Sequence, residues 1–200
     1  MTHLRPTIVI SFMGVDGSGK STLIYKLSKK LSKKFKKIKY LHLRPYLFLT
    51  NKRTVNSNPH NQKPQKSQFE SLLQIFIWLF MYIFFFFINL RKKNQLIIFD
   101  RYAHDLLIDK TRYRFNLSKT LTKYILNLFP QPNLWIILRT PIQLIEKRKK
   151  ELSTSELRRQ MKEYINFAKT KKSKIIIDTS RNITKNLSLI TKKILLYLND

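Results

Sequence analysis

Cysteine is absent from this chain of 200 residues. The sequence therefore excludes disulfides and thiolate metal sites, and this absence suits a reducing, cytoplasmic compartment. Carboxylates are scarce too, with 11 Asp and Glu against 40 Lys and Arg and a formal net charge of +29. The basic residues are spread along the whole chain, and no motif that combines basic and aromatic residues accompanies them. We therefore interpret the charge as general composition and do not expect specific nucleic-acid binding.

Glycine occurs three times, where average usage of ~7% would give roughly fourteen. All three glycines fall in one stretch, Gly14-Val15-Asp16-Gly17-Ser18-Gly19-Lys20-Ser21-Thr22, which matches the P-loop pattern. An apolar run over 7–12 precedes it, and apolar residues at helical spacing follow it. Such a loop binds polyphosphate through backbone N–H groups and a helix N-terminus. We predict that it binds ATP, with Lys20 on the terminal phosphates and Ser21 on Mg²⁺.

Apolar runs and amphipathic stretches alternate along the rest of the chain. Five runs read as strands, at 7–12, 37–43, 95–100, 133–138 and 174–178. The stretches between and after them read as helices, at 21–35, 72–90, 117–129, from 141, from 154 and at 183–198. This alternation predicts one α/β domain over residues 1–200, of the P-loop NTPase class, with a five-stranded parallel sheet between helices. Residues 50–67, rich in Asn, Lys, Pro and Gln, predict a flexible loop.

The third strand ends in a carboxylate, Asp100, after four apolar residues. Some eighty residues downstream of a P-loop, this is the Walker B arrangement, so we expect Asp100 to serve Mg²⁺ together with Ser21. Arg101 and Tyr102 follow at once. Asp105 and Asp109 come next, one helical turn apart, and Arg112 and Arg114 follow as possible phosphate-binding forks.

The stretch 72–90 is apolar except for Gln74 and Asn89, and Arg91-Lys92-Lys93 closes it. A membrane span needs ~20 apolar residues, and a buried helix has fewer. A span would separate the first strand from the third and prevent the sheet from forming. Three interpretations stay open: a core helix on one face of the sheet, a homodimer contact, or a peripheral membrane contact.

On these residues the chain resembles the thymidylate kinase-like P-loop kinases over nearly its whole length. The resemblance rests on 14–22, on Asp100-Arg101-Tyr102, on the basic region 148–159 in the place of the lid, and on Ile177-Asp178. It implies that Arg101 binds the acceptor phosphate and that Asp16 contacts the acceptor sugar or the metal shell. It also implies that the turn ending at Arg181 holds the donor adenine.

Two departures from the family pattern affect the catalytic and acceptor residues. Gly17 stands where family members carry an arginine, so the resemblance assigns the transition-state arginine to the lid. Arg148 is the first candidate, followed by Arg158 and Arg159. The acceptor loop keeps Arg44-Pro45 without the usual Glu and glycines, and the residues that read thymine are replaced. The expected acceptor-binding residues are Asp16, Arg44, Arg101, Tyr102 and Asp105.

The resemblance therefore implies an ATP- and Mg²⁺-dependent phosphotransferase that acts on a nucleoside monophosphate such as dTMP. An alternative acceptor is a sugar or lipid-linked intermediate of surface polysaccharide synthesis. A hydroxyl acceptor would require a base such as Asp16 or Asp105, whereas a monophosphate oxygen is already ionised. A different class of function is a non-catalytic, nucleotide-binding module attached to a membrane through 72–90.

Overall fold

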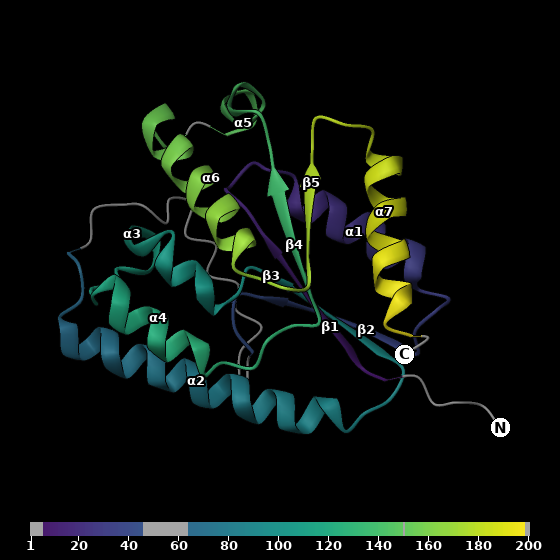
Figure 1. Ribbon diagram of the computed structural model, residues 1–200, viewed down its shortest axis with the longest axis horizontal. Helices are drawn as coiled ribbons and strands as arrows, with labels where there is room; N and C mark the ends of the chain where they lie inside the picture. The colour runs from purple at the N-terminus through teal and green to yellow at the C-terminus, as the bar shows by residue number, and fades with distance from the viewer. Residues whose placement is uncertain (1–5, 46–63, 150, 199–200) are drawn as a thin grey trace.

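A five-stranded parallel sheet forms the centre of the molecule (Figure 1). The computed structural model describes residues 6–45, 64–149 and 151–198. The strands are β1 (Ile8–Met13), β2 (Lys37–His42), β3 (Gln95–Asp100), β4 (Leu134–Arg139) and β5 (Lys174–Asp178). Their order is β2-β3-β1-β4-β5. The predicted fold class is thus confirmed, and each strand lies within a residue or two of its expected position.

Helices cover both faces of the sheet, because alternate residues of each strand point to opposite sides. On one side Ile8, Ile10 and Phe12 pack with apolar residues of α1 (Lys20–Leu31) and α7 (Ile183–Leu196). On the other side Val9 and Met13 pack with α2 (Gln68–Leu90), α4 (Lys119–Asn127) and α6 (Thr154–Lys169). Figure 1 shows the two groups of helices on either side of the strands. The remaining helices are η1 (Ala103–Leu107, a 3-10 helix), α3 (Lys110–Tyr113) and α5 (Ile142–Arg148).

The sheet order brings the two motifs together. β3 pairs with β1 in parallel, with Phe12 opposite Asp100. The P-loop leaves the carboxyl end of β1, and Asp100 ends β3 at the same edge. This edge is where open α/β sheets bind their ligands.

Helix α2 begins four residues before the predicted stretch. Ser67 and Glu70 form a capping box, in which the Ser67 Oγ accepts from Glu70 N at 3.1 Å and Glu70 Oε2 accepts from Ser67 N at 2.7 Å. One face of the helix packs on the core through Ile75, Trp78, Tyr82 and Phe85. The interpretation as a core helix on one face of the sheet is therefore confirmed for that face. By length and composition, α2 is also the one helix in the described ranges that could cross a membrane.

The segment after β3 forms two short helices that were not predicted from the sequence. η1 follows Tyr102 directly, and Asp109 caps α3 by accepting from Arg112 N at 3.2 Å. The predicted loop over 50–67 lies outside the described residues except for its last four. In the predicted lid, α5 ends at Arg148 and α6 begins at Thr154, where the Ser153 side chain caps the helix by accepting from Glu156 N.

Candidate active site

The P-loop backbone follows a path that favours glycine at two positions, Gly14 and Gly19. Gly14 has φ +154°, and a Cβ there would meet Leu138 Cβ and Ser18 Oγ at 3.2 Å. Gly19 has φ +91°, a left-handed conformation, and it is the N-cap of α1. The two glycines allow the chain to turn from β1 into α1 close against β4. The N-terminal amides of α1 are thereby presented at the sheet edge.

Lys20 is buried within this loop. Its Nζ donates to the carbonyl oxygens of Gly14 and Val15, both at 2.8 Å. Burial, and then the nearby charge of Arg101, lower the pKa of Lys20 to about 8. A polyphosphate would offer this ammonium anionic oxygens in place of the two carbonyls, so the position suits the predicted role.

Asp100 is ionised and has one oxygen available. Burial alone would raise its pKa, but the nearby His42 side chain and the charge of Lys20 lower it to about 2. Its Oδ2 accepts from the Tyr40 hydroxyl at 3.0 Å and lies 3.7 Å from His42 Nδ1. Its Oδ1 is buried and has no hydrogen-bond partner among the described residues. Such an oxygen fits a place in the hydration shell of a cation.

The residues present fit Mg²⁺ bound mainly through phosphates and water. The described ranges contain no group of three or more His, Cys, Asp or Glu that could hold a metal. Mg²⁺ is commonly bound by one or two protein oxygens, with substrate phosphates and waters completing the shell. Ser21, in the exposed first turn of α1, and Asp100 are the residues that would hold it.

Arg101 lies at the centre of a buried network and is only 1% exposed. Its φ of +74° is unusual for a side-chain-bearing residue, and its backbone N donates to Phe12 O at 2.9 Å. One end of its guanidinium donates to Asp16 in the P-loop. The other end donates to Asp105 and, at 3.0 Å, to the Tyr164 hydroxyl. The network thus fixes the arginine beside the P-loop.

Asp105 binds the end of the Arg101 guanidinium that does not contact Asp16. It is fully buried, and it accepts from Tyr113 at 2.7 Å, from Tyr164 at 2.5 Å and from Arg101. Burial and the Asp105 charge raise the pKa of both tyrosines well above the ordinary value. The geometry therefore makes Asp105 a positioning residue for Arg101.

Asp16 connects the P-loop to a second arginine, Arg112 of α3. One carboxylate oxygen accepts from Arg101 and the other from Arg112, and Lys20 Nζ lies 3.9 Å away. Burial would raise the pKa of Asp16, but Arg101, Lys20 and Arg112 together hold it well below its ordinary value. Asp16 is accordingly a fixed anion that gathers three cations at the P-loop.

A cavity of about 280 Å³ lies on the other side of the P-loop. Its lining includes Ser18, Gly19, Thr22, Arg148, Thr179 and Arg181. Arg148 also donates to Gly17 O at 3.2 Å. The structure therefore brings Arg148 and Arg181 together beside the phosphate loop, where the resemblance placed the donor nucleotide.

Other predicted site residues lie away from this centre. Arg159 binds Glu156 and donates to Ile108 O at 2.7 Å, and Arg158 lines a surface hollow with Ile142 and Met161. The Tyr102 hydroxyl donates to Pro130 O at 2.5 Å, and its ring packs in the core.

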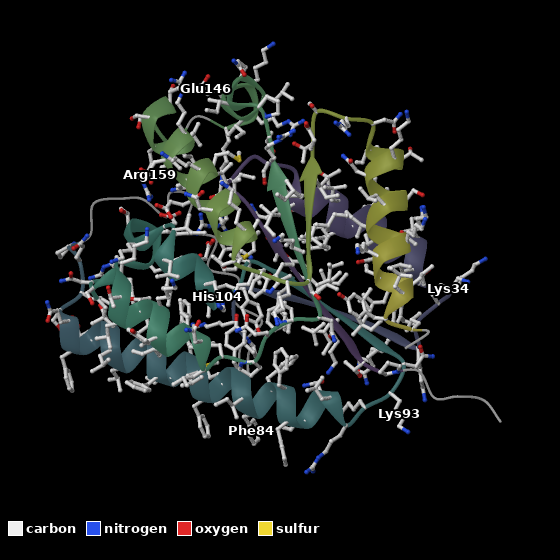
Figure 2. The ribbon with its side chains drawn as sticks, in the orientation of Figure 1. Lys34, Phe84, Lys93, His104, Glu146 and Arg159 are labelled. Atoms are coloured by element: carbon white, nitrogen blue, oxygen red, sulfur yellow. The ribbon has the colours of Figure 1, made fainter. Side chains whose placement is uncertain are left out.

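Two further residues show how the segments around the site are packed. Arg44 lies at the end of β2, exposed, with its guanidinium 5.9 Å from the Trp78 ring. His104 is a core residue against Trp135, in the interior of the molecule (Figure 2). Burial, and then Lys171, hold its pKa well below the ordinary value.

Several residues of the site were not assigned a role from the sequence. Tyr40 and His42 reach Asp100 because β2 pairs with β3, with His42 opposite Asp100. The apolar spacing predicted where β2 ends, but it did not predict which strand β2 pairs with. Tyr113 and Tyr164 come from α3 and α6, and no local pattern relates either of them to Asp105. Arg112 and Asp16 were both predicted as site residues, but the contact between them was not predicted.

No protein-family model and no curated protein sequence matches this chain. Solved structures do. A thymidylate kinase from Candida albicans is 18% identical, with 96% of this chain and 92% of that chain covered and a TM-score of 0.63. The chain has the thymidylate kinase fold.

Two further structures share the thymidylate kinase fold with this chain. One is the thymidylate kinase from Ehrlichia chaffeensis, at 18% identity, 94% and 98% coverage and a TM-score of 0.65. The other is deoxyadenosine kinase from M. mycoides with the products dCMP and dCDP bound, at 16% identity, 94% and 99% coverage and a TM-score of 0.61. The expected P-loop kinase fold is thereby confirmed.

Proposed function

We propose that this protein transfers the γ-phosphoryl group of Mg·ATP to a nucleoside monophosphate such as dTMP, in the cytoplasm. The observation that carries the proposal is the convergence of Arg101 and Arg112 on Asp16, inside the P-loop and 3.9 Å from Lys20. Guanidinium groups bind phosphate through paired N–H donors. Two of them beside a P-loop lysine support a second phosphate next to the ATP triphosphate.

The state of the carboxylates supports a phosphate acceptor over a hydroxyl acceptor. A sugar hydroxyl would need a base to remove its proton, and the oxygen of a monophosphate would not. Asp16 is bound by two arginines that hold its pKa well below the ordinary value, which makes it a weak base. Asp105 is fully buried and accepts from three donors of the protein. Neither carboxylate therefore suits the role of a base for a hydroxyl acceptor.

Catalysis would consist of alignment and charge neutralisation. Lys20 would leave the carbonyls of Gly14 and Val15 and bind the transferring phosphate. Arg148, already against Gly17, would reach the same group from α5. Mg²⁺, held by Ser21 and Asp100, would neutralise charge on the phosphate oxygens. Arg101, fixed by Asp105, and Arg112 would hold the acceptor.

The test is a transfer screen with radiolabelled ATP and Mg²⁺. The acceptors are dTMP, the other nucleoside monophosphates, deoxynucleosides and a panel of sugars and sugar phosphates. We expect transfer to a nucleoside monophosphate, lost in Lys20→Ala and Asp100→Asn variants that keep wild-type circular dichroism. Transfer to sugars or lipid-linked sugars alone would replace the acceptor class. ATP binding without transfer to any acceptor would indicate a non-catalytic nucleotide-binding module.

A further inference from the structure

A cavity of about 610 Å³ lies at the edge of the sheet where β4 and β5 begin. The strands are parallel, so this edge is opposite the one that holds the P-loop (Figure 1). The cavity volume falls within the range of ~300–1,000 Å³ that small-molecule sites occupy. None of the residues that line it belongs to the site around the P-loop. Its polar lining includes Gln131, Asn133, Lys171, Lys172, Ser173 and Tyr197.

The lining of this cavity is cationic and has no counter-charge. Two lysines, Lys171 and Lys172, belong to it, and among the residues that the structure describes it contains no Asp or Glu. Neither lysine forms an ion pair within the described ranges. At the P-loop, by contrast, Arg101 and Arg112 both pair with Asp16. The charge of the cavity is therefore left for a ligand to balance.

Aromatic rings and neutral groups surround the ammonium of Lys171. Its Nζ lies 5.0 Å from the centre of the Trp135 ring and 4.9 Å from the centre of the Phe167 ring. It donates to Gln131 Oε1 at 3.1 Å, and His104 Nε2 lies 3.4 Å away. An ammonium has three N–H donors, so at least one of them remains for a ligand. Burial lowers the pKa of Lys171, and the charge of a bound anion would raise it again.

His104, behind Lys171, supplies no negative charge either. Burial and the charge of Lys171 hold its pKa well below the ordinary value, so the ring is neutral. A neutral ring that accepts at Nε2 carries its proton on Nδ1. Nδ1 is buried and has no hydrogen-bond partner among the described residues. The interior next to Lys171 therefore leaves its charge uncompensated.

Other polar groups of the lining have hydrogen-bond donors left over. Asn133 Oδ1 accepts from Val9 N at 2.8 Å, which leaves the NH₂ end of the Asn133 amide for a ligand. The Tyr197 hydroxyl donates to Ser173 Oγ at 3.0 Å, so the proton of Ser173 can be donated elsewhere. Ammonium, amide and hydroxyl donors together suit a phosphate group, which has several acceptor oxygens and, as a monoester, a charge of about −1.5 to −2 at pH 7.

We propose that this cavity binds a small phosphorylated molecule, whose phosphate is bound by Lys171 and Lys172. Asn133 and Ser173 donate to the same phosphate. The cavity and the P-loop lie at opposite edges of the sheet and share no residue, so both sites can be occupied at once. The proposal does not depend on the reaction proposed for the P-loop site.

The first experiment uses the two tryptophans of the chain, Trp78 and Trp135, as local probes for fluorine NMR. The full chain is labelled with fluorotryptophan, and Trp78→Phe assigns the two signals. Inorganic phosphate is the probe ligand, and KCl of the same ionic strength is the reference. We expect a saturable shift of the Trp135 signal that chloride does not produce, with binding weakened at least about tenfold by Lys171→Met.

The matched control is Lys169→Met, which removes an exposed lysine of α6 that does not line the cavity and should keep the affinity of the parent. An equal loss in that control would show attraction by bulk charge and overturn the assignment of the site. The absence of a saturable shift in the parent would overturn the proposal itself.

Organic phosphates then identify the source of the phosphate group. Deoxythymidine monophosphate and ribose phosphate are titrated beside thymidine and ribose, with the Trp135 signal as the readout. We expect both phosphates to bind, and the one with the lower Kd names a nucleotide or a sugar phosphate as the source. Binding of thymidine and ribose as tight as that of their phosphates would show that the phosphate is not recognised and overturn the proposal.

Competitive acetylation tests the cavity in the unsubstituted protein. Mass spectrometry measures the acetylation of each lysine with and without saturating inorganic phosphate. We expect Lys171 to lose most of its acetylation while Lys169 is unchanged, and equal protection of the two would contradict a local site. The carboxylate of Asp200, three residues after Tyr197, is tested with Asp200→Asn. Phosphate binding that appears only in this variant would assign the cavity to the end of the chain and overturn the proposal.

Discussion

At the scale of single residues, the site depends on where charges are placed in a protein interior. Asp105 is fully buried and Asp16 is mostly buried, and the carboxylate of each accepts from guanidinium or hydroxyl donors. Fixed carboxylates of this kind hold cationic groups in position before substrate arrives. Lys20 is the opposite case, since its Nζ donates to two neutral carbonyls.

Lys20 should take up a proton when nucleotide binds at alkaline pH. With a pKa of about 8, it is about three-quarters neutral at pH 8.5, and the charge of a bound polyphosphate favours the ammonium. We expect an uptake of about 0.7 proton at pH 8.5 and almost none at pH 6.5. Calorimetry of Mg·ATP binding in buffers of different ionisation enthalpy measures it. The Lys20→Arg variant, which does not titrate in this range, should show no uptake at pH 8.5. Equal uptake in the two proteins would assign the proton to another group.

Asp105→Asn should impair catalysis through Arg101. The amide keeps the shape of the carboxylate but not its charge, so the guanidinium loses one of its two anionic partners. We expect kcat to fall about 100-fold, with a raised KM for the acceptor and an unchanged Kd for ATP. Glu163→Gln removes an exposed carboxylate that pairs with Lys119 and should leave all three values unchanged. Full activity of Asp105→Asn would contradict the positioning role.

At the scale of elements, short helix ends and strand ends build the site. η1 and α3 fold the segment after β3 back over the P-loop and so deliver Asp105 and Arg112. α5 ends at Arg148, against Gly17. α6 contributes Tyr164 from its buried face, while Arg158 and Arg159 lie on its outer side (Arg159 is labelled in Figure 2).

The lid arginine should be distinguishable by substitution. Arg148→Ala should lower kcat about 100-fold or more, because a transition-state arginine acts on charge that develops during transfer. Arg158→Ala and Arg159→Ala should each stay within about twofold of the parent, since their contacts are with α6 itself, Ile108 and a surface hollow. Single-turnover kinetics with saturating ATP measure the three variants. A larger loss in either α6 variant would move the role to that helix.

At the scale of the whole molecule, the charge imbalance opposes folding. With 40 basic and 11 acidic residues, repulsion within the compact state exceeds attraction. Salt screens such interactions between exposed charges over a Debye length of about 10 Å at 0.1 M.

The melting temperature should therefore rise between 50 and 500 mM KCl. Differential scanning calorimetry without nucleotide measures the change, and the ligand-free condition keeps phosphate binding out of the comparison. The quintuple variant Lys29→Glu/Lys33→Glu/Lys185→Glu/Lys192→Glu/Lys193→Glu, confined to exposed positions, should show a smaller rise. A melting temperature that falls with salt in the parent would show that ion pairs outweigh the net repulsion.

The sequence alone determined the parts of this protein that short patterns encode. The three glycines, the apolar strands and the carboxylate at the end of β3 predicted the P-loop, the parallel sheet and the position of Asp100 at the phosphate site. These features follow from backbone conformation and periodicity, which are local. The tertiary structure alone decided which distant side chains meet: Asp16 with Arg112, Asp105 with Tyr164, and His42 with Asp100. It also decided that Tyr102 faces the core and that one side of α2 stays uncovered. Such contacts depend on strand order and on the rotation of each helix about its axis, and neighbouring residues in a sequence do not specify either.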